Sequence, residues 1–165
     1  MVRHTYKQSK NYQQKTTIMK KMMMAVAVFL TVLTGTAFAN PTEVNPKVIK
    51  AFHSTFVSAD DVSWSTGGDY YRASFTYNSK NVFAYYSKEG KFLGITRLMS
   101  TSELPLMLQT SFKNKYADYW VTDLFELDNT DGISYYMTLE NAEEVIIVKS
   151  SGSSDWSTFK KSKKQ

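Results

Sequence analysis

The chain has 165 residues, no cysteine and a formal net charge of +5. The lack of cysteine excludes disulfides, thiolate catalysis and cysteine-ligated zinc or iron–sulfur centres. The charge is unevenly distributed, because residues 1–39 hold six of the 20 basic side chains and no acidic one. Residues 40–165 therefore carry 14 basic and 15 acidic side chains. That balance removes the net positive charge that attracts nucleic acids, so we expect no nucleic-acid partner.

Residues 1–39 have the pattern of a secretory signal peptide. Two lysines precede the uncharged run at residues 22–39, which ends in a small-x-small cleavage pattern. The alternative is a membrane anchor, but the clearly apolar part has about 12 residues and a bilayer span takes about 20. We therefore expect an exported protein, periplasmic or secreted, with no membrane span after cleavage. Met19 is an alternative translation start, which would place residues 1–18 upstream of the protein.

The first predicted helix begins at Asn45-Pro46, a capping residue followed by a proline whose missing N–H costs nothing in the first turn. Val48, Phe52 and Phe56 recur every four residues and form one apolar stripe. Strands are expected next, near residues 61–66, 70–77, 82–87 and 91–98.

A second helix is predicted to open around Ser102–Pro105, where Leu108, Phe112 and Tyr116 repeat the stripe. Strands are then expected near residues 119–128, 133–140, 144–149 and 155–159. Short turns such as "STGG" and "NTDG" predict hairpins and therefore a mainly antiparallel sheet. The basic segment Lys160–Lys164 has the composition of a solvated, frayed terminus.

The order of a helix followed by four strands occurs twice, and matching aromatic and apolar positions lie 60 to 64 residues apart. The sequence therefore predicts an α+β fold: two tandem α-β-β-β-β repeats that form a mainly antiparallel sheet with two helices on one face. The half-repeats would span about residues 45–98 and 102–160 of a single domain at residues 40–165. Chance similarity between two amphipathic segments is the alternative.

Four motifs resemble those of the PepSY-like proteins, small exported bacterial domains related in fold to the beta-lactamase inhibitor protein (BLIP). The motifs are Val62-Ser63-Trp64, Tyr71-x-Ala73-x-Phe75, Ala84-x-Tyr86 with Gly90, and Leu104-Pro105. The resemblance implies tandem αβ repeats, an extracytoplasmic location and protein binding or inhibition through the uncovered sheet face, and it supplies no catalytic residues. One departure is Asn78–Asn81, which replaces the glycine expected in a hairpin and predicts a longer turn there.

The residues beyond the leader offer little for catalysis or metal binding. They contain one histidine, His53, on the first predicted helix, and no Gly-x-Ser-x-Gly motif that could present a serine. The segment Asp128–Gly132 is typical of a hairpin turn and lacks the spacing of an EF-hand calcium loop. We therefore expect neither an enzyme nor a bound cofactor or metal, and we assign no catalytic residue.

Aromatic residues carry the remaining signal, and the period-two alternation of strands assigns them to faces. If Tyr71, Ala73 and Phe75 face the helices, the opposite face holds the candidate binding residues. These candidates are Tyr70, Arg72, Phe83, Tyr85 and Tyr136, with Val145 and Ile147 beside them. Tyrosine, tryptophan and arginine dominate the energetics of protein interfaces. Cross-strand pairs that only stabilise the sheet are the alternative, whereas the three tryptophans are expected to anchor the core or its edge.

The sequence thus predicts an exported, non-enzymatic domain that binds a protein or peptide, as an inhibitor or scaffold would, through the uncovered sheet face. The alternative function is a sensor or carrier of a small ligand or metal ion in the cell envelope.

Overall fold

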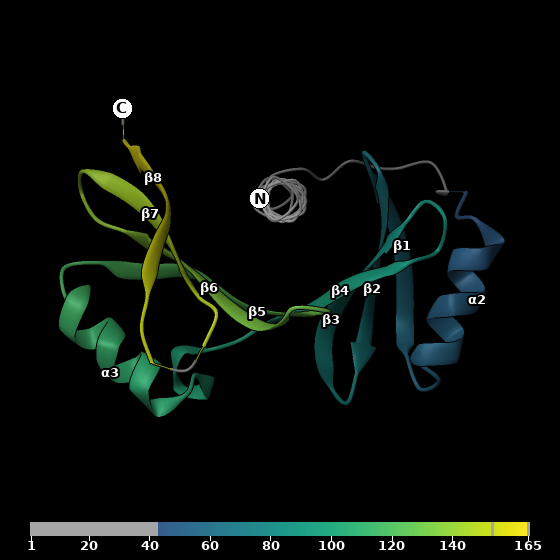
Figure 1. Cartoon of the computed structure of the whole chain (residues 1–165), viewed down its shortest axis with the longest axis horizontal. Coiled ribbons are helices and arrows are strands. Elements are labelled where there is room, and N and C mark those ends of the chain that lie inside the picture. Colours follow the sequence, from purple (N-terminus) through teal and green to yellow (C-terminus); the bar gives the residue numbers. More distant parts are fainter. Residues whose placement is uncertain (1–42, 153, 165) are drawn as a thin grey trace, which may run out of the picture. The chain divides into compact units, whose positions relative to one another are not determined.

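The computed structural model describes residues 43–152 and 154–164 (Figure 1). The predicted leader at residues 1–39 and the alternative start at Met19 lie outside them, so the signal peptide and the domain boundaries stay predictions. Within the described ranges, no helix is long and apolar enough to cross a bilayer.

The first helix, α2 (Pro46–Thr55), begins where its sequence predicts. Asn45 is the capping residue, and its side-chain oxygen accepts a hydrogen bond from the backbone N–H of Lys47 at 3.0 Å. This bond satisfies one of the amides that a helix start leaves without a partner, and proline in the first turn needs none.

The second helix, α3 (Leu106–Lys115), has its N-cap at Pro105, within the segment where its sequence predicts it to open. A short 3-10 helix, η2 (Thr101–Glu103), precedes it. The Glu103 carboxylate folds back and accepts a hydrogen bond from the backbone N–H of Ser100 at 2.8 Å, which closes a capping box around this turn. Pro105 then separates η2 from α3, because the residue before a proline disfavours helical geometry.

Eight strands form one antiparallel sheet in which each strand pairs with the next one along the chain. They are β1 (Asp60–Gly67), β2 (Tyr70–Tyr77), β3 (Lys80–Ser87), β4 (Phe92–Leu98), β5 (Trp120–Asn129), β6 (Gly132–Glu140), β7 (Glu144–Ser150) and β8 (Ser157–Lys163). The predicted α+β class and antiparallel sheet are therefore confirmed. The internal duplication stays a prediction.

Two hydrophobic clusters hold the helices to the sheet, near its opposite ends (Figure 1). The first joins Val48 and Phe52 of α2 to β2 and β3, and the second joins Leu108 of α3 to β5, β6 and β7. Ile95 of β4 packs against the first cluster and pairs with Asp128, which shares a face of β5 with Leu124 of the second cluster. Both clusters thus lie on the same face of the sheet. We call the other face the open face.

The hairpin between β2 and β3 corrects one expectation. Tyr77 pairs with Lys80, so the turn consists of Asn78 and Ser79 alone and is not lengthened. Both residues have positive φ, 49° and 61°, as a type I′ turn requires at its two central positions. Asparagine tolerates this region better than most residues, which lets the hairpin close without glycine.

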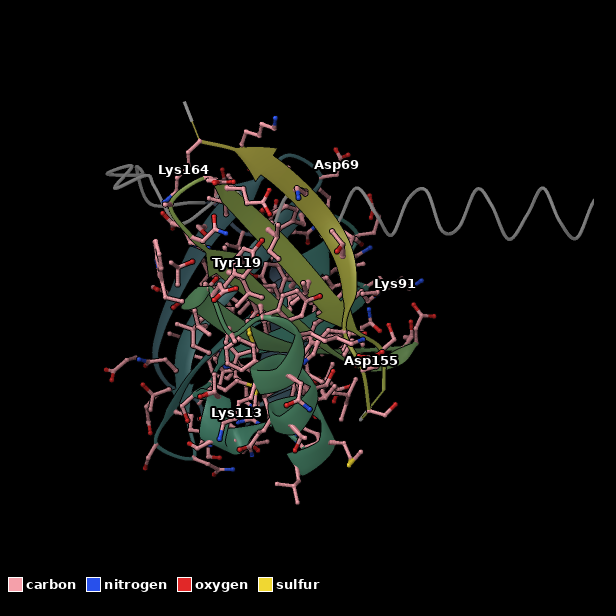
Figure 2. All side chains as sticks on the ribbon, turned by 90° about the vertical axis from the view of Figure 1, so that its left-hand side faces the viewer. Asp69, Lys91, Lys113, Tyr119, Asp155 and Lys164 are labelled. Carbon is pink, nitrogen blue, oxygen red and sulfur yellow. The ribbon has the colours of Figure 1, made fainter. Side chains whose placement is uncertain are left out.

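The C-terminal segment and the tryptophans also differ from what the sequence predicts. The basic segment Lys160–Lys164 is not a frayed terminus, because β8 runs through Lys163 and pairs with β7 (Figure 2). The tryptophans also differ from one another. Trp156 is 4% exposed and donates a hydrogen bond from its indole N–H to the Leu108 carbonyl oxygen at 3.0 Å, whereas Trp120 is 51% exposed and anchors no core.

Candidate binding face

Strand register places the candidate residues of the first half on the open face. Ala73 pairs with Ala84 beneath α2, and the flanking pair is Arg72 with Tyr85. Because side chains alternate along a strand, Arg72 and Tyr85 point away from the helix. Phe83 and Tyr70, two positions along each strand, do so as well. The alternation predicted from the sequence is therefore correct for these four side chains, although their use in binding is a separate matter.

The same register brings the second half of the chain onto this face. Tyr136 of β6 pairs with Phe125 of β5 on one side and with Lys149 of β7 on the other. The Phe125 and Tyr136 rings are stacked, with centroids 5.2 Å apart, and Phe159 meets Tyr136 edge-on at 5.5 Å. Sequence analysis missed Phe125, Lys149 and Phe159. Period-two alternation in β5 and β7 could have found the first two once the strand order was known.

The candidate rings differ in how much solvent reaches them. Tyr85 is 5% exposed and Tyr136 is 1% exposed, whereas Tyr70, Arg72 and Phe83 are half-buried. Tyr85 and Tyr136 therefore offer little surface to a partner, and the binding role of all five candidates stays a prediction. Among the five candidates, Tyr70, Arg72 and Phe83 expose the most surface.

Cations lie against the rings of the open face. The Arg72 guanidinium carbon is 5.5 Å from the centre of the Phe83 ring, and its Nε donates a hydrogen bond to Ser65 Oγ at 3.1 Å. The Lys149 ammonium is 5.3 Å from the centre of the Tyr136 ring. Such cation–π contacts hold each charge at a defined place above the sheet.

Burial also sets the protonation state of the face. Burial raises the pKa of Tyr85 to about 12, and the nearby Arg72 charge offsets this only in part. The hydroxyl is therefore neutral at physiological pH and does not act as a base there. Burial also raises the pKa of Asp123, which shares the open face of β5 with Phe125.

His53 and the acidic residues are the other groups in the described part of the chain that the sequence raised as candidates for catalysis or metal binding. His53 is exposed on α2 and meets the edge of the Phe52 ring. In the part of the chain that the structure describes, no three histidine or carboxylate side chains are grouped so as to hold a metal ion. The segment Asp128–Gly132 forms the β5–β6 hairpin turn, in which the Asn129 side chain accepts a hydrogen bond from the Asp131 N–H at 2.9 Å.

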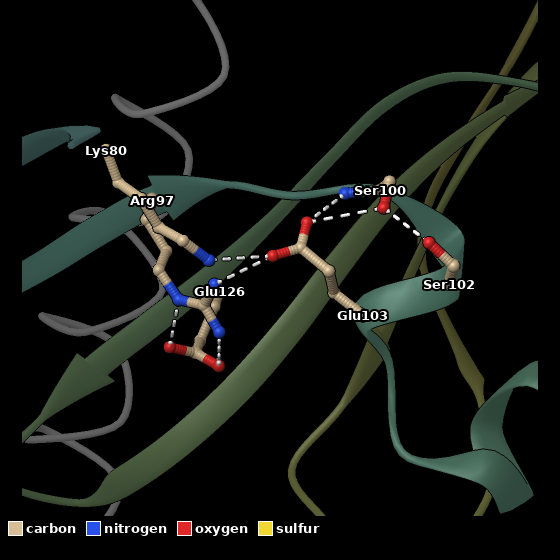
Figure 3. A network of polar contacts seen from close by, with 6 residues as sticks. All are labelled: Lys80, Arg97, Ser100, Ser102, Glu103 and Glu126. Carbon is tan, nitrogen blue, oxygen red and sulfur yellow. Dashed lines mark hydrogen bonds and ion pairs between the residues drawn. The ribbon is translucent and has the colours of Figure 1, made fainter. Parts of the chain in front are cut away.

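On the helix side, a polar network crosses the junction of β4 and β5 (Figure 3). Arg97 of β4 donates two hydrogen bonds to the Glu126 carboxylate of β5, at 2.9 and 3.1 Å. Glu103 of η2 joins them by accepting hydrogen bonds from Lys80 at 2.9 Å and from Arg97 at 3.4 Å. A pocket of about 390 Å³ lies beside the network, with Ile95 in its wall.

This network predicts a pH dependence of stability. The hydrogen bond from Lys80 and the one from the Ser100 backbone hold the pKa of Glu103 at about 2, against an ordinary value of 4.5. Because the folded state binds the proton more weakly, the stability that Glu103 contributes is present above about pH 4.5 and is lost as the pH falls toward 2. The variant Glu103→Gln should therefore have a lower urea midpoint than wild type at neutral pH, and the gap should close in acid.

The control for this prediction is Glu143→Gln, which removes an exposed carboxylate outside the network. Its midpoint should stay close to that of wild type across the same pH range. A gap between Glu103→Gln and wild type that does not change with pH would contradict the proposed role of the carboxylate.

Comparisons with known proteins identify a fold and nothing finer. No protein-family model matches the chain, and no curated protein matches its sequence. A BLIP-like protein from Bacteroides fragilis is 17% identical, with a TM-score of 0.61, and the match covers 78% of this chain and 89% of that one. A DUF2874 family protein from Bacteroides ovatus is 15% identical, with a TM-score of 0.66, covering 74% of this chain and 89% of the other.

A third solved structure, of a Bacteroides eggerthii protein described as periplasmic, is 12% identical, with a TM-score of 0.65, and the match covers 74% of this chain and 90% of that one. The chain therefore has a BLIP-like fold, as its motifs suggested. The resemblance to PepSY-like proteins stays a prediction.

Proposed function

We propose that this chain is an exported, non-enzymatic domain that binds a protein or peptide through its open face. The observation that supports this most is the open face itself, where half-buried rings and cations lie on a sheet surface that neither helix covers. Residues of this kind contribute most to protein interfaces. The periplasmic description of one structural neighbour supports an extracytoplasmic location, either periplasmic or secreted.

The test is chemical cross-linking of the purified domain to its partners in a cell-envelope extract, followed by identification and binding measurements with each purified partner. The variant Tyr70→Ser/Phe83→Ser removes two rings that are half-buried on the face. It should lose at least about tenfold in affinity, since replacing a hot-spot residue costs about 2 kcal/mol or more. Circular dichroism confirms that the variant is folded.

The matched control is Leu106→Ser/Met107→Ser, which removes two apolar side chains from α3 that are 74% and 60% exposed. This control should bind like wild type, because α3 lies on the other face of the sheet. If the control loses binding and the ring variant keeps it, the partner uses the helix side and the proposal fails.

The alternative function, a small-ligand or metal-ion sensor or carrier, draws support from the pocket beside Arg97 and Glu126. Thermal melting with panels of metal ions, haem and lipids separates the two functions. A large upward shift with one of these compounds, lost in a variant of the pocket, would favour the carrier.

A further inference from the structure

Arg72 and Lys149, two cations of the open face, lie over aromatic rings and contrast with the cations that form ion pairs. On the helix side, Arg97 pairs with Glu126. Near the end of α3, Lys115 pairs with Asp155 at 2.6 Å. Within residues 43–152 and 154–164, by contrast, neither Arg72 nor Lys149 has a carboxylate at ion-pair distance, and each lies over an aromatic ring.

Lys160 adds a third positive charge on this face. It pairs with Ile147 in the β7–β8 ladder, which places it on the same side as Lys149, and it is exposed. The Lys164 charge, farther along, is compensated because it forms an ion pair with Glu140. The face therefore has an excess of uncompensated positive charge, even though residues 40–165 as a whole have a formal charge of −1.

A partner that covers this face has to compensate those charges. Removing an arginine or lysine from water is unfavourable unless the partner supplies an anion. The flat Arg72 guanidinium lies over the Phe83 ring and keeps donors that suit a carboxylate. Covering the cations with a neutral or basic surface would therefore be unfavourable.

Asp123 of β5 also lies on the open face, and it forms no ion pair in the described part of the chain. Since burial already raises its pKa, this group can be covered in its neutral form at a lower cost than an arginine can. It lies across from Thr138, one row away from the pair of Tyr136 with Lys149. The acidic groups of a partner should thus lie over Arg72 and Lys149 and avoid the Asp123 end.

We propose that the partner of the open face is an acidic segment of a protein, with carboxylates that meet Arg72 and Lys149 and apolar side chains that meet Tyr70 and Phe83. This inference rests on the proposed function, because it names the chemistry of the partner at the same face. Two other anionic partners fit less well. Nucleic acids bind best to domains with a net positive charge. Anionic membranes bind best to clusters of about four to eight basic residues.

The experiment measures fluorescence anisotropy of short labelled peptides with the purified domain. One peptide alternates glutamate with tyrosine, and its two matched peptides carry glutamine or lysine in place of glutamate. Wild type should bind the glutamate peptide at least about tenfold more tightly than the glutamine peptide, equal to about 1.4 kcal/mol, and should not bind the lysine peptide. Equal affinity for the glutamate and glutamine peptides, or no binding of the glutamate peptide, would overturn the inference.

Charge reversal gives a second measurement. The variant Arg72→Glu/Lys149→Glu should exchange the preference and bind the lysine peptide more tightly than the glutamate peptide. The control Lys50→Glu/Lys113→Glu makes the same change of charge at exposed positions of α2 and α3 and should keep the wild-type order. A control that also exchanges the preference would assign the effect to net charge and overturn the inference.

Phosphatidylglycerol vesicles and a single-stranded oligonucleotide complete the set of probes. Tighter binding of either one than of the glutamate peptide would replace the acidic protein segment by that partner. These outcomes can be told apart from failure of the proposed function. Suppose that a purified partner no longer binds Tyr70→Ser/Phe83→Ser but still binds Arg72→Glu/Lys149→Glu as it binds wild type. The open face would then remain the binding surface, and the proposal of an acidic segment would be rejected.

Discussion

Replacing Phe52 with alanine should lower the free energy of unfolding by about 3–5 kcal/mol, the range for removing a large ring from a core. Phe52 is fully buried and lies at the centre of the first hydrophobic cluster. Its ring meets Phe75 edge-on at 4.9 Å and Trp64 at 5.3 Å, and aromatic pairs of this geometry add stability beyond the buried area. Urea unfolding followed by circular dichroism measures the loss.

Two variants bracket that result. Phe52→Leu keeps most of the apolar volume and should lose less stability than the alanine variant. Val57→Ala changes a side chain that is 86% exposed just after α2 and should change the free energy of unfolding by less than about 0.5 kcal/mol. A loss for Phe52→Ala no larger than that for Val57→Ala would show that α2 does not depend on this cluster.

The parts of the fold that depend on nearby residues alone were predictable from the sequence. The cap at Asn45 and the four-residue stripe through Phe52 determine α2, and alternation separates Ala73 from Arg72. Prediction failed at the end of the chain, where another strand decides the outcome. The last strand, β8, extends through Lys163 because β7 supplies an edge for pairing.

The candidate site shows the same division. Its face was predicted correctly from the period of two, because side-chain direction is a property of the strand itself. The burial of Tyr85 and Tyr136 was not predicted, because exposure depends on neighbours that come from other strands, such as Phe125 stacked on Tyr136. Alternation alone could not indicate which ring positions stay accessible.

Breaking the ion pair between Arg97 and Glu126 should also lower the free energy of unfolding substantially. Both side chains are mostly buried, 28% and 16% exposed, and the bidentate contact lies within the ladder that joins β4 to β5. Arg97→Met leaves the Glu126 carboxylate without its main partner, which should cost about 2–4 kcal/mol of unfolding free energy. Urea unfolding at neutral pH measures the loss.

A second substitution distinguishes a lost charge pair from lost packing. Arg97→Met/Glu126→Leu removes both charges and should be more stable than Arg97→Met alone, since an apolar pair of similar volume often replaces an ion pair at little cost. Lys115→Met breaks an exposed pair and should cost no more than about 1 kcal/mol. A double variant less stable than Arg97→Met would contradict this account.

The same ladder pairs Thr96 with Leu127 on the open face, so it holds the Phe83 side and the Tyr136 side of that face in one register. We therefore expect Arg97→Met, but not the double variant, to weaken binding of the glutamate peptide. The measurement is anisotropy at a temperature where circular dichroism shows both proteins to be folded. If Arg97→Met and wild type bind the peptide with equal affinity, binding at the open face does not depend on the strand register at this junction.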